Sequence, residues 1–228
     1  LDVCTGYGVE RAEAEDAEEL TAQWAGRSKA AWLEIPEPYK GLLFGIVQGN
    51  FFHDLRKQSA EKLLALELPG YALGGLSVGE PFELFDEFVE RTAALIPRNK
   101  PLYVMGIGTP DYILSAVRAG VDMFDCVFPT RAARNGTVFT DSGRVVLKHA
   151  AHTRSHLPIE EGCPCSACTR YSRAYLRHLF KSNEMLGPIL ATEHNLTFLQ
   201  RFMERLRTSI REGRFHQFER HFLEQYQA

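Results

Sequence analysis

Between residues 41 and 128, short apolar runs alternate with stretches whose apolar residues recur at helical spacing. The runs predict strands at residues 42–47, 71–73, 102–105 and 123–127, and the stretches between them predict helices at 55–66, 84–96 and 112–117. Strands joined by helices lie parallel and buried on both faces. The pattern indicates an α/β protein, either a doubly wound sheet or a (β/α)8 barrel, and both bind ligands at the carboxyl ends of their strands.

The flanking segments have other patterns. Residues 14–33 predict an acidic, alanine-rich helix that ends before Pro36 and Pro38. Residues 138–140 and 144–147 flank Asp141-Ser142-Gly143, which predicts a hairpin. A helix is expected at 171–180. Residues 195–224 predict a long helical stretch with one buried face, formed by Leu196, Leu199, Phe202, Met203, Leu206 and Ile210.

Composition narrows the function classes. The 228 residues include 45% hydrophobic and 24% charged residues, which excludes disorder and low-complexity architectures. No apolar run approaches the roughly 20 residues that a membrane span needs. The net charge of −3 divides into 10 Lys and Arg against 17 Asp and Glu in residues 1–100, and 16 against 12 in residues 101–228. The later part could therefore carry either a phosphate-binding surface or an ordinary solvated basic face.

The cysteines point to a metal site. Five cysteines are an odd number, and three of them lie in Cys163-Pro-Cys165-Ser-Ala-Cys168, which favours a metal site in a reducing cytoplasm over a disulfide framework. A histidine would complete a tetrahedral Cys3His shell, and four protein ligands make such a zinc site structural. Spacing alone leaves the histidine open among His149, His152, His156 and His194. Unliganded surface thiols are the alternative.

Two carboxylates lie inside the last apolar run of the alternating region. Period-two alternation places Asp122 and Asp125 on opposite faces of a strand, so one of them should point into a pocket. A carboxylate at the end of a buried parallel strand favours a functional role, because burying a charged group without a role costs free energy. Cys126 is expected to be a small buried hydrophobe.

Several motifs occur in the order in which tRNA-guanine transglycosylases have them, and the chain resembles that family over nearly its whole length. These motifs are Gly45-Ile-Val-Gln48-Gly49, Leu73-Gly74-Gly75-Leu76-Ser77-Val78-Gly79-Glu80, Tyr103-Val-Met105-Gly106, the segment from Asp122 through Asp125, Arg131 and Arg134 to Gly136, the cysteine cluster, and Thr192-Glu-His194-Asn195. The resemblance implies a zinc-containing (β/α)8 barrel that replaces guanine at the tRNA anticodon wobble position with 7-aminomethyl-7-deazaguanine (preQ1).

The resemblance also assigns roles residue by residue. It implies that Asp125 is the nucleophile and that Arg131 and Arg134 hold the anticodon loop. The implied base-binding groups are Asp2, Gln48, the Gly75 backbone, the Leu76 carbonyl, which would accept from the aminomethyl group, and Met105, which would pack on the face of the base. The implied ligands of one structural zinc are Cys163, Cys165, Cys168 and His194. Cys4 and Val78 match the bacterial pattern, whereas Ser77 departs from it mildly.

An aromatic stripe follows the cysteine cluster. Tyr171, Tyr175 and His178 recur at i, i+4 and i+7, a pattern found both at interfaces and on a subdomain's own core. Because members of the resembled family pair through this region, we expect a homodimer. We expect it to be cytoplasmic, because the cysteines favour a reducing compartment.

Four strands are too few to close a barrel. Residues 1–4 resemble the end of a further strand, so residues 1–135 are expected to form the C-terminal half of the barrel, and residues 136–228 the hairpin, the zinc subdomain and the last helices. The family's Asp-Ser-Gly-Gly segment, which supplies the acid/base, does not occur here. Rival interpretations are a non-catalytic tRNA-binding or partner subunit, an inactive fragment, or an isolated zinc module.

Overall fold

The computed structural model describes residues 1–38 and 41–226, and the chain forms two compact units. One unit contains residues 1–108 and 112–126, and the other contains residues 109–111 and 127–228. Helix α5 (Phe128–Arg134) belongs to the second unit, because it packs against the later helix α8 (Leu186–Arg211) and strand β5 (Thr137–Thr140).

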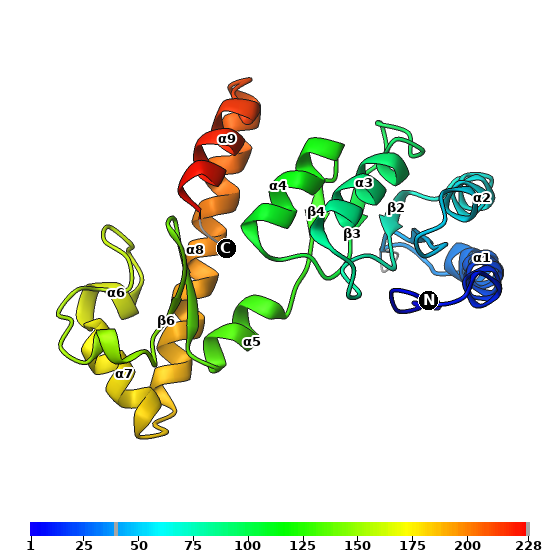
Figure 1. The fold of residues 1–228 in the computed structure, drawn as a ribbon. Helices are drawn as coiled ribbons and strands as arrows, with labels where there is room; N and C mark the ends of the chain where they lie inside the picture. The colour runs from blue at the N-terminus through cyan, green and yellow to red at the C-terminus, as the bar shows by residue number, and fades with distance from the viewer. Residues whose placement is uncertain (39–40, 227–228) are drawn as a thin grey trace. The chain divides into compact units, whose positions relative to one another are not determined.

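The first unit is built on a parallel four-stranded sheet whose strands lie side by side in chain order (Figure 1). The strands are β1 (Phe44–Val47), β2 (Gly70–Leu73), β3 (Leu102–Val104) and β4 (Met123–Phe124). Their last residues are in register, because Val47 pairs with Leu73, Leu73 with Val104, and Val104 with Phe124. The predicted α/β class is confirmed, and the order lacks the reversal that marks a doubly wound sheet.

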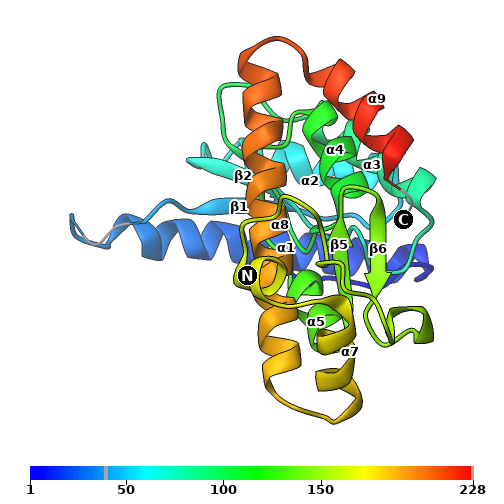
Figure 2. The same cartoon turned by 90° about the vertical axis from the view of Figure 1, so that its left-hand side faces the viewer.

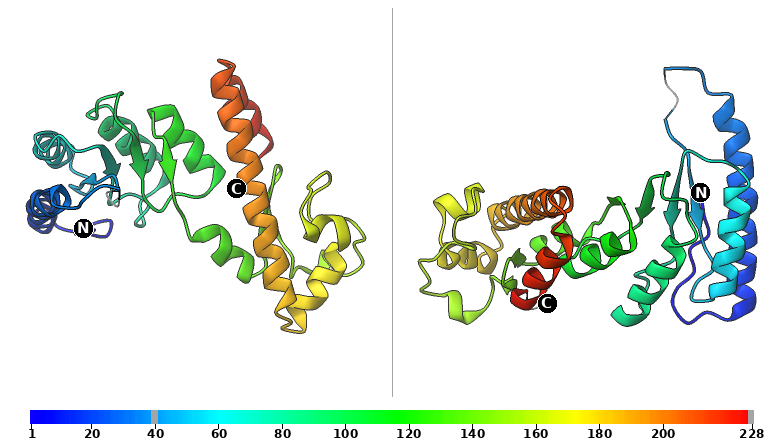
Figure 3. Two further views of the ribbon diagram at one scale, coloured as in Figure 1. Left: turned by 180° about the vertical axis from the view of Figure 1, so that it is seen from behind. Right: turned by 90° about the horizontal axis from the view of Figure 1, so that it is seen from above.

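Four helices accompany this sheet, as the sequence pattern predicts. They are α1 (Arg11–Leu33), α2 (His53–Leu64), α3 (Phe82–Ala93) and α4 (Pro110–Ala119). Helices α1 and α2 run side by side, as the right-hand view of Figure 3 shows. Gly45 of β1 is packed so closely that an added Cβ would lie 2.8 Å from Leu68 Cδ1, so this face of the strand has no room for a side chain.

Three expectations for strands need correction. All four residues of β2 are buried, but β1 and β3 alternate between buried and partly exposed positions, so burial on both faces holds only for β2. Residues 1–4 form no strand, and the Val3 amide donates to the Thr21 hydroxyl (2.9 Å). The last strand ends at Phe124, and helix α5 begins at Phe128 with Pro129, whose fixed φ suits a first helical turn.

The second unit packs a hairpin and short helices against one long helix, α8, which passes along the hairpin in Figure 2. Strand β5 pairs with β6 (Gly143–Val146), which confirms the predicted hairpin. The remaining elements are the 3-10 helix η1 (Ala150–His152) and the helices α6 (Ser166–Arg170), α7 (Arg173–Lys181) and α9 (Phe215–Gln225). No helix in the described part of the chain is long and apolar enough to span a membrane.

The buried face of α8 differs from the predicted one. The helix ends at Arg211 and α9 begins at Phe215, with Gly213 at a φ of +67° between them. Phe202 and Leu206 are buried as predicted, but Leu196 is 46% exposed and Ile210 is 48% exposed. The buried positions include polar residues that hydrophobic periodicity does not detect, and they are Gly187, Leu190, Ala191, His194, Asn195, Phe198, Phe202, Leu206 and Ser209.

This corrected face predicts the effect of truncating each side of the helix. Phe202→Ala removes a ring that is 1% exposed and packs against Phe222, with ring centroids 4.9 Å apart. We expect it to lower the free energy of unfolding by about 3–5 kcal/mol. Leu196→Ala, the control, should change it by less than about 0.5 kcal/mol. Urea unfolding measures both, and an equal loss in the two variants would contradict the described face.

Candidate active site and metal centre

Candidate site residues follow the carboxyl end of each parallel strand. Gln48 follows β1, Gly74 and Gly75 follow β2, Met105 follows β3, and Asp125 follows β4. Because the last residues of the four strands are paired in register, these positions lie along one edge of the sheet. The structure therefore places the sequence-predicted residues of the first unit at the edge where parallel sheets bind their ligands.

Gln48 is the most constrained of these residues. It is buried, and its Nε2 donates to Asp2 Oδ2 at 2.6 Å, which joins two of the predicted base-binding residues. A Cβ on Gly74 would lie 2.5 Å from Gln48 Nε2, and one on Gly75 would lie 2.6 Å from Gln48 Oε1. Gly75 also has a φ of +64°. The Gly74-Gly75 backbone thus approaches the amide of Gln48 more closely than any residue with a side chain could.

The turn after Gly75 is held by Glu80. Leu76 is buried, and Ser77 has a φ of +58° although it is not glycine. The buried Glu80 carboxylate accepts from the Ser77 amide (2.5 Å) and the Val78 amide (2.8 Å). These two hydrogen bonds fix the backbone that carries the Leu76 carbonyl. Met105 is partly exposed, and its amide donates to the Leu73 carbonyl at 3.4 Å.

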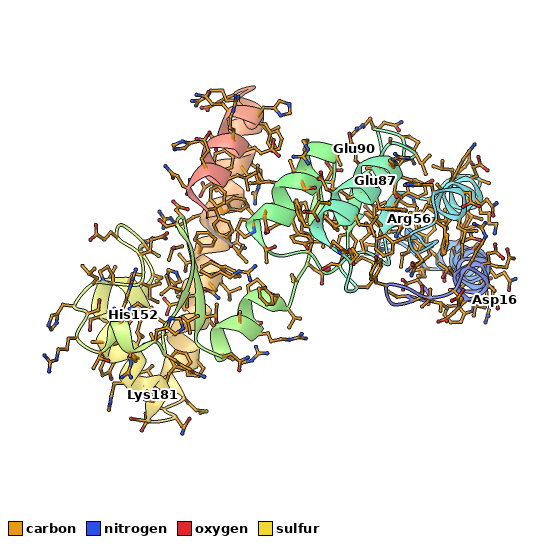
Figure 4. The ribbon with its side chains drawn as sticks, in the orientation of Figure 1. Asp16, Arg56, Glu87, Glu90, His152 and Lys181 are labelled. Atoms are coloured by element: carbon orange, nitrogen blue, oxygen red, sulfur yellow. The ribbon has the colours of Figure 1, made fainter. Side chains whose placement is uncertain are left out.

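Arg56 lies behind these loops, on the side of α2 that faces the sheet (Figure 4). It is 1% exposed, and its guanidinium donates to the carbonyls of Asn50 (2.7 Å), Gly74 (3.1 Å) and Gly75 (3.2 Å). Burial lowers the pKa of Arg56 to about 10, and the nearby charge of Glu80 opposes that shift. The group is therefore a buried cation at neutral pH.

Asp125 is oriented by two donors. Its Oδ1 accepts from the Tyr103 hydroxyl at 2.5 Å and from the Gly106 amide at 3.0 Å. Burial raises the pKa of Tyr103 to about 12, and the hydrogen bond to Asp125 adds to the shift, so Tyr103 is a neutral donor at physiological pH. Asp125 itself is exposed, which leaves its other oxygen accessible.

The neighbours of Asp125 have different surroundings. Asp122 is also exposed, and its Oδ2 accepts from the Leu102 amide at 2.9 Å, while its own amide donates to the Leu102 carbonyl at 2.8 Å. Asp122 thus pairs with the beginning of β3 and Asp125 with its end. The prediction that Cys126 is buried is wrong: it is partly exposed, and its thiol donates to the Gly106 carbonyl at 3.2 Å.

The second unit contains a group of four side chains that can hold a metal ion. The ligand atoms of Cys163, Cys165, Cys168 and His194 all lie within 4.8 Å of one another. His194 Nδ1 is 3.7, 3.5 and 3.3 Å from the three sulfur atoms in that order. His149, His152 and His156 are not among the described residues grouped there, so the structure selects His194 from the histidines that spacing left open.

The surroundings of this group suit a metal. His194 is fully buried, and its Nε2 lies 2.7 Å from the Phe139 carbonyl, so a proton on Nε2 leaves Nδ1 free to bind the ion. A hydrogen bond from Cys168 lowers the pKa of Cys165, whereas the same hydrogen bond raises the pKa of Cys168 and burial raises the pKa of Cys163. Three thiol groups and one imidazole are the donors that structural zinc sites use. The residues present therefore fit a four-coordinate ion with no open position.

The other predicted residues of the second unit lie on exposed surfaces. Arg131 and Arg134 are both exposed on α5 and are spaced to share one helix face. Tyr175 and His178 are exposed on α7, whereas Tyr171 is partly buried and precedes that helix. The three rings still form one stripe, since Tyr171 stacks on Tyr175 with centroids 5.2 Å apart and His178 lies 6.4 Å from Tyr175.

Sequence reasoning missed Tyr103, Arg56 and Asn50. Tyr103 occupies a strand position that the pattern counts as core, and Arg56 occupies a helix position that it counts as solvated. Asn50 has a φ of +49°, is buried, and donates to Thr5 Oγ1 (2.9 Å) and the Gly6 carbonyl (2.8 Å). An asparagine beside a glycine after a strand was the one available signal, because asparagine tolerates positive φ.

These features define an α/β protein with a candidate active site at the strand ends and a separate Cys3His metal centre. The sequence profile of the queuine tRNA-ribosyltransferase family matches residues 1–228, and the chain belongs to that family. It is 48% identical over 227 residues to the queuine tRNA-ribosyltransferase of Treponema denticola, and 49% identical over 226 residues to that of Borrelia hermsii.

A third relative has the same printed name. The queuine tRNA-ribosyltransferase of Symbiobacterium thermophilum is 49% identical over 228 residues. The alignments cover 100%, 99% and 100% of this chain and 60%, 60% and 56% of the three relatives. The chain therefore spans little more than half of the length of these relatives.

The metal centre predicts a stoichiometry. We expect one metal ion per chain, and Cys165→Ala or His194→Ala should lose most of it because three ligands cannot complete the shell. His152→Ala, outside the group, is the control and should keep the metal. Metal analysis after gel filtration measures the content. Full metal content in the Cys165→Ala and His194→Ala variants, or none in the parent, would contradict the assignment.

Proposed function

We propose that the protein containing this chain is a tRNA-guanine transglycosylase, which exchanges guanine at the anticodon wobble position for 7-aminomethyl-7-deazaguanine. The proposal rests on one observation above the others: Gln48, Gly75, Met105 and Asp125 follow four strand ends that are paired in register. The family match over residues 1–228 supports the same reaction.

In this proposal Asp125 is the nucleophile. Its free carboxylate oxygen attacks the ribose C1′ while the bond from C1′ to guanine N9 breaks, which gives a covalent ribosyl ester and releases guanine. The incoming base then attacks C1′ through N9, and the carboxylate leaves. Two inversions give retention of configuration. Tyr103 and the Gly106 amide hold the other oxygen, so the attacking atom is aimed before substrate arrives.

The neighbouring strand ends recognise the base. Asp2, Gln48 and the Gly75 backbone would bond its polar edge, and Met105 would pack on its face. The Leu76 carbonyl would accept from the aminomethyl group of the incoming base. The hydrogen bond that already joins Gln48 to Asp2 supports their acting together on one ligand.

The RNA would be held by Arg131 and Arg134. Both are exposed at i and i+3 of α5, and neither forms an ion pair with another residue in the described part of the chain. Guanidinium groups without internal partners can bind phosphates bidentately. Such contacts would keep the target nucleotide splayed from its neighbours, as base exchange requires.

We further propose the wider architecture. The four strands would form the C-terminal half of a (β/α)8 barrel, and a segment beyond these 228 residues would supply the other strands and the acid/base that transfers protons to and from the bases. The Cys3His group would hold one structural zinc, which supplies folding energy to the second unit and takes no part in base exchange. Cysteines grouped as metal ligands are typical of a reducing compartment, which supports a cytoplasmic location.

The rival interpretation is a non-catalytic tRNA-binding or partner subunit. The presence of Asp125 together with Gln48 and both arginines argues against it. The two donors on Asp125 Oδ1, together with the exposure of the Asp125 side chain, support the catalytic interpretation.

The nucleophile is tested by replacing one carboxylate at a time in the full-length protein. Asp125→Asn keeps the shape but removes the anionic nucleophile, so exchange of labelled guanine into tRNA should fall by at least about 10³-fold. Asp122→Asn should retain most exchange and lose stability, because Asp122 bonds to the backbone of Leu102 at the beginning of β3. Substantial exchange by Asp125→Asn would refute the assignment.

The same assay tests the role of the segment beyond this chain. The 228-residue chain alone should show no exchange, because it lacks the acid/base and the rest of the barrel. Exchange by the isolated chain would refute the half-barrel proposal while leaving the role of Asp125 open to the variants above.

We also propose that the full-length protein is a homodimer that pairs through Tyr171, Tyr175 and His178. The exposure of Tyr175, at 40%, supports an interface better than a purely internal packing role. Tyr175→Ala should shift sedimentation toward the monomer at the parent's concentration. Tyr7→Ala removes another exposed ring, in the first unit, and should sediment like the parent. An unchanged profile for Tyr175→Ala would exclude these residues as the interface.

A further inference from the structure

Arg56 links the backbones of two loops at the strand ends. Its Nε donates to the Asn50 carbonyl in the loop after β1, and its Nη2 donates to the Gly74 and Gly75 carbonyls after β2. The planar guanidinium makes these bonds from one rigid group, so the separation of the two loops is set by its geometry.

The loops that Arg56 joins carry the proposed base-binding groups. Gln48 lies against Gly74 and Gly75, and it bonds to Asp2. Asn50 donates to Thr5 and Gly6, in the same terminal segment as Asp2. The contacts therefore form a ring. Arg56 bonds to Asn50, and Asn50 bonds to the N-terminal segment. Asp2 of that segment bonds to Gln48, which lies against the two glycines that Arg56 also bonds.

For a purely structural role, burial of the Arg56 guanidinium would carry a large free-energy cost of desolvation. Arg56 is 1% exposed, forms no ion pair with another residue in the ranges 1–38 and 41–226, and its Nη1 has no hydrogen-bond partner there. The Phe88 ring, 5.8 Å from the guanidinium carbon, and the charge of Glu80 offset part of the desolvation. An apolar side chain of similar size commonly stabilises a core as well as a buried charge does.

We propose that Arg56 is a positioning residue for base recognition, which holds the Gly74-Gly75 backbone and the Asn50 loop at the separation that the purine edge requires. This inference rests on the proposed function and adds a residue to the same site. Arg56 touches backbone carbonyls and not the reacting carboxylate, so its loss should weaken base binding and leave the chemical step intact.

The test is base-exchange kinetics of Arg56→Lys in the full-length protein, with guanine and tRNA varied separately. Lysine keeps the charge but lacks the fork, so it cannot hold both loops. We expect the KM for guanine to rise about tenfold, which corresponds to about 1.4 kcal/mol. The kcat and the KM for tRNA should stay within about twofold of the parent.

Three further variants make the result decisive. Leu63→Ala truncates a buried side chain on the same helix without touching either loop, so it lowers stability and should leave the KM for guanine unchanged. Asn50→Gly accepts the φ of +49° and should fold, yet it releases Thr5 and Gly6, so it should raise the same KM. Arg56→Met, an apolar side chain of similar length, decides the matter where Arg56→Lys fails to fold: it should fold, release both loops and raise the same KM.

The outcomes separate this inference from the function on which it rests. A KM for guanine within about twofold of the parent in Arg56→Lys and Asn50→Gly, or an equal rise in Leu63→Ala, would overturn the positioning role. Absence of exchange in the parent would instead remove the proposed function, and this inference with it.

Discussion

The in-register ends of four parallel strands are the constraint on which the first unit depends. Val47, Leu73, Val104 and Phe124 are paired in sequence, so whatever residue follows each strand is delivered to the same edge of the sheet. Parallel pairing requires a long crossover between consecutive strands, and α2, α3 and α4 form these crossovers. The candidate active site is therefore a consequence of strand register, and its loops need only supply chemistry and local shape.

Close backbone approach supplies that shape. Gln48 contacts Gly74 and Gly75 at distances that no Cβ would allow, and Arg56 bonds the carbonyls of the same two residues. The Gly74-Gly75 dipeptide is thus contacted by two polar side chains, those of Gln48 and Arg56. The metal group of the second unit works on a different principle, because three thiols and His194 converge there without strand register.

The sequence predicted the features that local pattern encodes. The βα alternation located the strands and helices, the hairpin signal at Asp141-Ser142-Gly143 was correct, and the cysteine spacing located the metal group. What it missed depends on tertiary geometry. Hydrophobic periodicity placed Leu196 in the core, but it could not predict that Asn195 is buried. The Asn195 side-chain oxygen accepts from the Phe139 amide, and its NH2 group donates to the Pro129 carbonyl. The roles of Tyr103 and Arg56 exist only once separate strands are brought together.

The central claim is that a carboxylate oxygen of Asp125, the residue after β4, forms the covalent bond to ribose. The most direct measurement begins by quenching the full-length protein with denaturant during turnover on tRNA. The protein and the tRNA are then digested, and fragmentation mass spectrometry locates the residue that carries the ribose. The account predicts attachment at Asp125. Attachment at Asp122 or at any other residue, or no attachment in protein that exchanges guanine, would contradict it.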